Sequence, residues 1–175
     1  IETTTPLSTD GSLILYTFND DEGKKAFWHS SAHVLAEAIL SFYPKAKLTI
    51  GPAIDNGFYY DVDLGDAVIS DKDFKQLETK FIEIARGKHE FSIRSVSKAD
   101  ALSLYKGENN EYKVELIENL TDGDITFCDH SNFTDLCRGG HIPNTGIIKA
   151  IKIMSVAGAY WRGDEKNNQL TRVYG

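Results

Sequence analysis

Residues 48–62 read Leu-Thr-Ile-Gly-Pro-Ala-Ile-Asp-Asn-Gly-Phe-Tyr-Tyr-Asp-Val, and this stretch decides the fold class. Asn56-Gly57 separates two β-prone runs, 48–54 and 58–62. An Asn-Gly pair is typical of a tight turn, because both central residues of the favoured hairpin turn need a positive φ. The stretch therefore predicts a β-hairpin.

Helical patterns lie on both sides of this hairpin. The first helix is predicted at about 21–42, where Asp20 or Asp21 can cap it and Pro44 follows its end. The second is predicted at about 71–86, where Ser70 and Asp73 resemble a capping box and Gly87 suits the stop. Its buried stripe is expected to be Phe74, Leu77, Phe81 and Ile84.

The rest of the chain holds mostly short β-prone runs. Strands are predicted at 91–96, 112–117 and 125–128, a β-rich segment at 147–156, and a closing hairpin from 159–162 and 169–174. A short helix is expected between Ser97 and Gly107. We therefore predict an α+β fold, with a largely antiparallel sheet and helices packed on it.

Residues 1–20 differ from the remainder. They hold one short apolar run, Leu13–Tyr16, which follows Asp10-Gly11 and predicts a turn and a strand. This segment is too small to fold alone, so we divide the chain into a tail or linker, 1–20, and a folded domain, 21–175. The first residue is Ile1 rather than Met, and we interpret the chain as a piece of a longer protein.

Composition narrows the class of protein. The chain has 175 residues, 41% apolar and 26% charged, enough for one sizeable domain. No apolar run approaches the roughly 18 residues that span a membrane, so we expect no membrane partner. Reduced cytoplasmic thiols are the expected state of Cys128 and Cys137, because nothing marks the chain as secreted. The net charge of -7 argues against an extended nucleic-acid surface.

Two motifs carry candidate chemistry. His29 and His33 are spaced i, i+4, which puts both imidazoles on one face of the predicted helix. Cys137 and His141 flank Arg138-Gly139-Gly140, a loop in which glycines allow close backbone approach. The alternative for each motif is incidental: one buried and one exposed histidine, or an ordinary glycine turn. Together the four residues suit either a zinc ion or a metal-free hydrolytic site.

Three further residues are candidates on weaker grounds. Lys113 is expected to point away from the apolar face of its predicted strand, where the alternative is a solvated side chain. Asp135 precedes Cys137 by two residues, where it would orient a histidine or bind an ammonium group, or simply cap the loop. Of Tyr59 and Tyr60, only one can face the core, which leaves the other hydroxyl for a cleft.

Four blocks of sequence occur in an order that resembles the second N-terminal domain of threonyl-tRNA synthetases, over about residues 24–175. These blocks are His29–His33, Gly51–Asp61, Cys137–His141 and Ala157–Asp164. The tail before residue 20 resembles the end of the small ubiquitin-like (TGS) domain that precedes editing domains in this family. The aminoacylation core, with its ATP site, lies outside the resemblance, so we do not expect this chain to charge tRNA.

The resemblance implies an editing function, hydrolysis of serine wrongly attached to tRNA(Thr). It implies catalytic roles for His29, His33, Lys113, Cys137 and His141, and substrate-binding roles for Tyr60 and Asp135. The implied partners are the serine-carrying 3′ end of tRNA(Thr) and the remaining domains of a cytoplasmic, homodimeric parent enzyme. Such editing is needed because a pocket separates ligands that differ by one methyl by only about 1–3 kcal/mol.

Two other functions remain open at this point. Free-standing alanyl-tRNA editing proteins share the histidine and cysteine motifs and are similar in holding zinc there, so zinc stays a candidate cofactor without being assigned. A catalytically silent tRNA-binding module would keep the fold and lose hydrolysis. Cys128 and His130 form a second Cys/His neighbourhood, which we interpret as structural or surface residues.

Overall fold

Two antiparallel sheets organise the chain in the computed structural model, which describes residue 3 and residues 5–175. The five-stranded sheet has the order β1 (Lys47–Leu48), β3 (Gly57–Asp63), β8 (Gln169–Tyr174), β7 (Ser155–Tyr160), with β2 (Ala53–Ile54) paired to β3. The three-stranded sheet has the order β4 (Ser92–Ser95), β5 (Thr126–His130), β6 (Phe133–Leu136). The predicted α+β fold is confirmed, and β2 and β3 form the expected hairpin.

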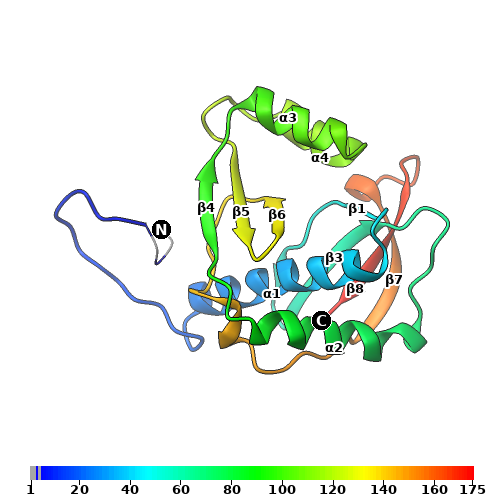
Figure 1. Cartoon of the computed structure of the whole chain (residues 1–175), viewed down its shortest axis with the longest axis horizontal. Coiled ribbons are helices and arrows are strands. Elements are labelled where there is room, and N and C mark those ends of the chain that lie inside the picture. Colours follow the sequence, from blue (N-terminus) through cyan, green and yellow to red (C-terminus); the bar gives the residue numbers. More distant parts are fainter. Residues whose placement is uncertain (1–2, 4) are drawn as a thin grey trace.

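Four helices accompany these sheets: α1 (Asp21–Phe42), α2 (Asp71–Arg86), α3 (Lys98–Gly107) and α4 (Glu111–Glu118). Helices α1 and α2 pack on each other, and α1 also packs on β3 of the larger sheet. Helices α3 and α4 pack together at the far end of the β4–β6 sheet (Figure 1). The predicted capping box of α2 is present, since the Ser70 N–H donates to the Asp73 carboxylate over 2.8 Å.

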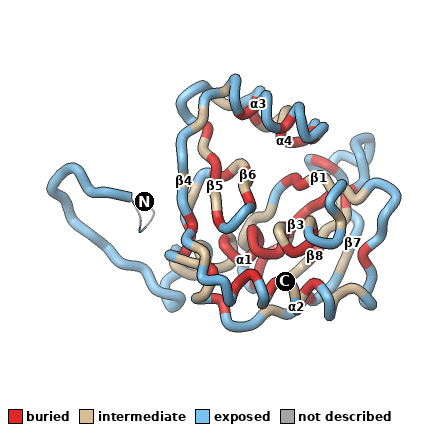
Figure 2. Tube along the Cα trace, viewed as in Figure 1, coloured by how far each residue is buried: buried red, intermediate tan, exposed pale blue. Residues whose placement is uncertain are grey.

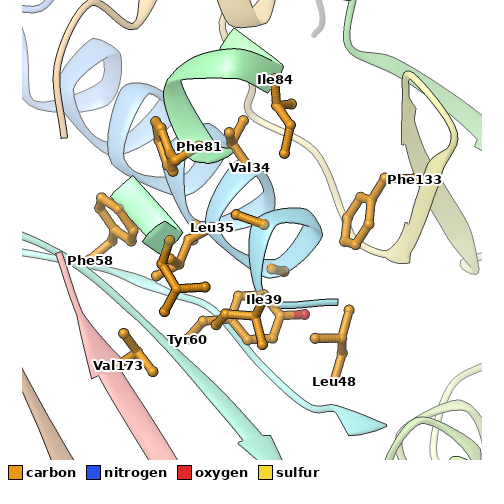
Figure 3. Packing of buried hydrophobic residues seen from close by; sticks show 14 of the residues in the cluster. Val34, Leu35, Ile39, Leu48, Phe58, Tyr60, Phe81, Ile84, Phe133 and Val173 are labelled. Carbon is orange, nitrogen blue, oxygen red and sulfur yellow. The ribbon is translucent and has the colours of Figure 1, made fainter. Parts of the chain in front are cut away.

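The main core surrounds α1. Residues 30–39 of this helix are buried, apart from Glu37, because the sheet, α2 and the chain around β6 cover it on different sides (Figure 2). Leu35 and Ile39 pack among Phe58, Tyr60 and Val173 from β3 and β8 (Figure 3). A helix buried in this way is held by apolar packing along most of its length.

A second, smaller core lies under α3 and α4. Its buried members are Ala101, Tyr105, Ile117, Ile125 and Phe127. Tyr112, Trp161 and Leu170 form a further small cluster, which joins α4 to the β7–β8 hairpin. The chain therefore has one large core around α1 and smaller ones that support α4 and β5.

Three predicted strands are wrong. Residues 112–117 belong to the helix α4, because Asn110 caps a run of helix-forming residues and six alternating positions are too few to establish a period. Leu13–Tyr16 are exposed and form no strand, since no strand lies beside them to pair with. Most of 147–156 is irregular, with a 3₁₀ turn at Thr145–Ile147 and β7 starting only at Ser155.

The proposed tail, 1–20, includes residues 1, 2 and 4, which lie outside the described residues. Helix α1 begins at Asp21. The division of the chain into a tail, 1–20, and a folded domain, 21–175, stays a prediction. Over the described part of the chain, none of the helices has the length and apolar character needed to cross a membrane.

Candidate active site

Helix α1 presents His29 and His33 on one face, with ring centroids 4.7 Å apart. The loop after β6 brings Cys137 and His141 to the same place. The Nε2 atom of His29 lies 2.9 Å from the Cys137 Sγ, and the His141 Nε2 lies 3.4 Å from it. The two sequence motifs, more than 100 residues apart, therefore form one cluster, and neither incidental alternative holds.

Backbone geometry explains how the loop approaches the helix. Gly139 and Gly140 have φ values of 96° and 90°, a region that side chains other than glycine rarely enter. Ile142 then donates its N–H to the Ser30 hydroxyl over 3.0 Å, and the Ser30 hydroxyl donates to the Ala26 carbonyl of α1. The serine beside His29 thus fastens the loop to the helix.

Neighbouring acceptors favour one tautomer for both helical histidines. The His29 Nδ1 lies 3.3 Å from the Gly51 carbonyl, which can only accept, so Nδ1 carries the proton and Nε2 keeps its lone pair. The His33 Nδ1 lies 3.3 Å from the Asp135 Oδ2, an ion-pair contact without hydrogen-bond geometry that favours the same tautomer. The His33 Nε2 is buried and also has no hydrogen-bond partner among the described residues.

Burial keeps these imidazoles neutral. Burial first, and then the neighbouring His33 and His141, lowers the pKa of His29 to about 3. Burial also lowers the pKa of His33, although Asp135 opposes the shift. The cluster therefore offers ring lone pairs rather than positive charges.

Asp135 joins four elements at the floor of the site. Its Oδ1 lies 2.5 Å from the Lys113 Nζ of α4, and its Oδ2 accepts the Tyr60 hydroxyl of β3 over 2.6 Å, beside His33 of α1. Burial would raise the pKa of the Asp135 carboxyl, but Lys113 and His33 outweigh it, so the net shift is downward. Burial, and then Asp135, raises the pKa of Tyr60 well above its usual value. Asp135 is thus an anion held by a cation and a phenol.

A cleft of about 1160 Å³ opens over this cluster. Its wall includes His29, His33, Lys113, Asp135 and Cys137. Tyr60 and His141 are buried and stand behind that wall, in contact with Asp135 and Cys137. All seven predicted site residues therefore meet, five at the cleft and two behind it.

The four histidine and cysteine residues fit a zinc ion. One ligand atom from each of His29, His33, Cys137 and His141 lies within 4.8 Å of the others. Imidazole nitrogen and thiolate are the ligands that zinc prefers. The unpartnered His33 Nε2 and the outer contacts to Gly51 and Asp135 match the way proteins orient metal-binding histidines.

The structure also shows supporting contacts that the sequence did not predict. The Gly51 carbonyl orients His29, and the Tyr105 hydroxyl accepts the Leu136 N–H over 2.9 Å, between Asp135 and Cys137. Tyr105 stands in no motif, so no signal marked it. Cys128 and His130 are buried rather than on the surface. The Cys128 Sγ lies 3.8 Å from the His141 Nδ1, behind the site.

Comparison with known proteins shows what this chain is similar to. Residues 125–174 match the family model described as the threonyl and alanyl tRNA synthetase second additional domain. The chain is 70% identical over all 175 residues to a threonine–tRNA ligase of Flavobacterium psychrophilum, and 71% identical to one of Flavobacterium johnsoniae. A third such ligase, of Parabacteroides distasonis, is 54% identical over 170 residues.

The chain is thus similar over its whole length to part of these threonine–tRNA ligases. It spans 27% of the length of each Flavobacterium relative and 26% of the Parabacteroides one. The segment that matches the domain family includes Asp135, Cys137 and His141. His29, Tyr60 and Lys113 lie before that segment in the chain, and the fold brings them to it.

Proposed function

We propose that this chain hydrolyses the ester that joins serine to the terminal adenosine of tRNA(Thr), as an editing domain. The observation that carries the proposal is the meeting of neutral His29 and His33, Cys137, and the Lys113–Asp135 pair at one cleft. The relatives are threonine–tRNA ligases, and serine is the amino acid that such an enzyme would attach in error. Serine is smaller than threonine, so a synthetic pocket cannot exclude it sterically.

In this proposal, His29 holds the attacking water. Its Nε2 lies 2.9 Å from the Cys137 Sγ, so the attacking water must displace that thiol contact to donate a hydrogen bond to the Nε2 lone pair. A pKa of about 3 makes His29 a poor final proton acceptor. The water oxygen bonds to the ester carbonyl carbon, the bond from that carbon to the ribose oxygen breaks, and the ribose oxygen leaves with the proton. His33 supports this arrangement from the next helical turn, and His141 shapes the pocket from behind Cys137.

Lys113 stabilises the negative charge that develops on the carbonyl oxygen. Its ammonium group lies at the cleft wall and is fixed by Asp135, so it needs no rearrangement during the reaction. Asp135 and Cys137 receive the amino and hydroxyl groups of serine. The Asp135 carboxylate offers about four lone-pair sites, and its contacts with Lys113, Tyr60 and His33 do not fill all of them. Tyr60 acts through Asp135, to which its hydroxyl is bonded.

A zinc ion held by His29, His33, Cys137 and His141 would supply Lewis-acid activation of a bound water. Zinc dependence together with a preference for alanine esters would favour the alanyl-type deacylase instead.

Only the terminal nucleotide needs to enter this cleft, so the acidic chain itself need not bind the body of the tRNA. We assign that binding to other parts of the parent enzyme. We assign residues 1–20 to a linker or preceding unit, in which Leu13, Ile14 and Leu15 are exposed. Binding of tRNA(Thr) to the chain alone is expected to be weak and to fall further with salt. Tight binding at physiological salt would contradict this division.

The test is release of amino acid from Ser-tRNA(Thr), Thr-tRNA(Thr) and Ala-tRNA, with and without a chelator. We expect rapid release of serine alone. His89→Ala serves as a control, because His89 lies outside the cleft lining. If the chain is inactive, the same assay in the full-length synthetase decides between a missing tRNA-binding part and a silent module; inactivity there as well would refute the proposal.

A further inference from the structure

Asn110 is a buried residue outside every recognised motif, and all four of its polar groups are bonded. Its side chain is the N-cap of α4, where Oδ1 accepts the Lys113 N–H over 3.1 Å. Its Nδ2 donates to the Leu48 carbonyl of β1 over 2.9 Å. Its backbone N–H donates to the Tyr105 carbonyl of α3, and its carbonyl accepts the Val114 N–H. One residue of 4% exposure therefore ties α3, α4 and β1 together, with its side chain bonded to α4 and β1 and its backbone to α3.

This link spans the two supports of Asp135. On one side, Asn110 caps the turn of α4 that carries Lys113. On the other, it bonds β1, which pairs with β3, the strand that carries Tyr60. Lys113 and Tyr60 meet at Asp135 with contacts of 2.5 and 2.6 Å. A change in the spacing between α4 and β1 must therefore lengthen one of these contacts.

Other polar links also join α4 to the larger sheet. Lys47 and Glu111 form an ion pair of 2.7 Å whose side chains are 32% and 53% exposed, so water competes with it. Tyr112 donates to the Asp63 carboxylate over 2.7 Å. Of these links, only the one made by Asn110 bonds the backbone of Lys113 itself.

We propose that Asn110 is a positioning residue for Lys113, an inference that rests on the deacylation proposed above. Asn110 touches no substrate. It sets the distance between the first turn of α4 and β1. At this distance the Lys113 ammonium group contacts Asp135 and also reaches the cleft wall. Without the bond to Leu48, α4 keeps its cap and is free to shift, and the ammonium group no longer meets the developing charge.

The first test is Asn110→Ser, assayed in whichever of the chain or the full-length synthetase deacylates Ser-tRNA(Thr) in wild-type form. Serine still caps a helix but is too short to bridge to the Leu48 carbonyl. We expect kcat to fall about 10- to 100-fold, as for a misplaced catalytic group, with KM little changed. Glu111→Gln, which breaks the exposed pair between the same two elements, is the control and should keep wild-type kcat.

A double-substitution cycle separates positioning from general destabilisation. In a Lys113→Ala background, Asn110→Ser should cause no further loss of kcat, because the group that it positions is gone. An unchanged kcat in Asn110→Ser, or an equally large loss in both backgrounds, would overturn the inference. Urea unfolding is followed for each protein; if Asn110→Ser does not fold, Asn110→Asp, which keeps the cap and removes the Nδ2 donor, takes its place.

The controls also separate this inference from the function on which it rests. No serine release by the wild type in either form would refute the proposed function, and this inference with it. Serine release by the wild type that Lys113→Ala leaves unchanged would remove the role of Lys113, and thereby that of Asn110, while the editing function stands.

Discussion

The two sides of the cleft hold their site residues by different means. On one side, His29 and His33 stand on a helix whose middle is buried in the large apolar core. On the other, Lys113 stands on α4, which packs on the smaller cores, and Asp135 lies in β6 between the large core and a smaller one. Short polar contacts fix these two residues: Lys113 to Asp135, Tyr60 to Asp135, and Asn110 to Leu48. Apolar packing is spread over many atoms, whereas a buried polar contact depends on one or two. Single-atom changes should therefore cost more on the second side.

The largest expected effect is that of Asp135→Asn, which removes one charge and keeps the shape. It leaves the buried Lys113 ammonium without its anion, and breaking a buried pair in this way costs about 3–5 kcal/mol. Urea unfolding measures the loss. Glu83→Gln breaks the exposed Lys80–Glu83 pair and should cost less than about 1 kcal/mol. An equal loss of unfolding free energy in the two variants would show that the buried ion pair stabilises the chain no more than the exposed one.

Gly51→Ala tests the helical side through its neighbour. An added Cβ would lie 2.3 Å from the Tyr60 ring, so either that ring or the backbone that carries the Gly51 carbonyl must shift. We expect a loss of about 1–3 kcal/mol, as for other overpacked sites. In Gly107→Ala, the new methyl group meets nothing within 4 Å, and the helix α3 should be unchanged or more stable. A harmless Gly51→Ala would show that this carbonyl does not fix His29.

A gradual effect, spread over a range of pH, follows from the neutral histidines. In the folded chain the pKa of His29 is lowered to about 3, whereas the unfolded chain takes up that proton below about pH 6.5. The free energy of unfolding should therefore be highest above pH 6.5 and fall as the pH drops toward 3, by at most about 1.4 kcal/mol per unit for each such histidine. The lowered pKa of His33 acts in the same direction. Urea titrations of the wild type and His29→Gln check this; a slope that His29→Gln leaves unaltered would contradict it.

The comparison also explains what the sequence could predict. The spacing of His29 and His33 and the adjacent glycines of the 138–140 loop are local signals, so both motifs were found before the fold was known. Lys113 lies at the cleft, but on a helix rather than the predicted strand, because the eight residues of α4 carry a weak period and the cap that decides it is a single asparagine. The contacts of Gly51, Tyr105 and Asn110 join distant segments through backbone groups, and no residue type or spacing announces such contacts.

The most direct test is whether the histidine side and the lysine side of the cleft act as one active site. Serine release from Ser-tRNA(Thr) should be measured for His29→Ala, Lys113→Ala and the double variant, in a form of the protein that is active when unsubstituted. We expect the rate of serine release to fall at least about 100-fold in each single variant and little further in the double one. The effects of groups that act together on one reaction do not add. Undiminished serine release in both single variants would contradict the proposal of one active site.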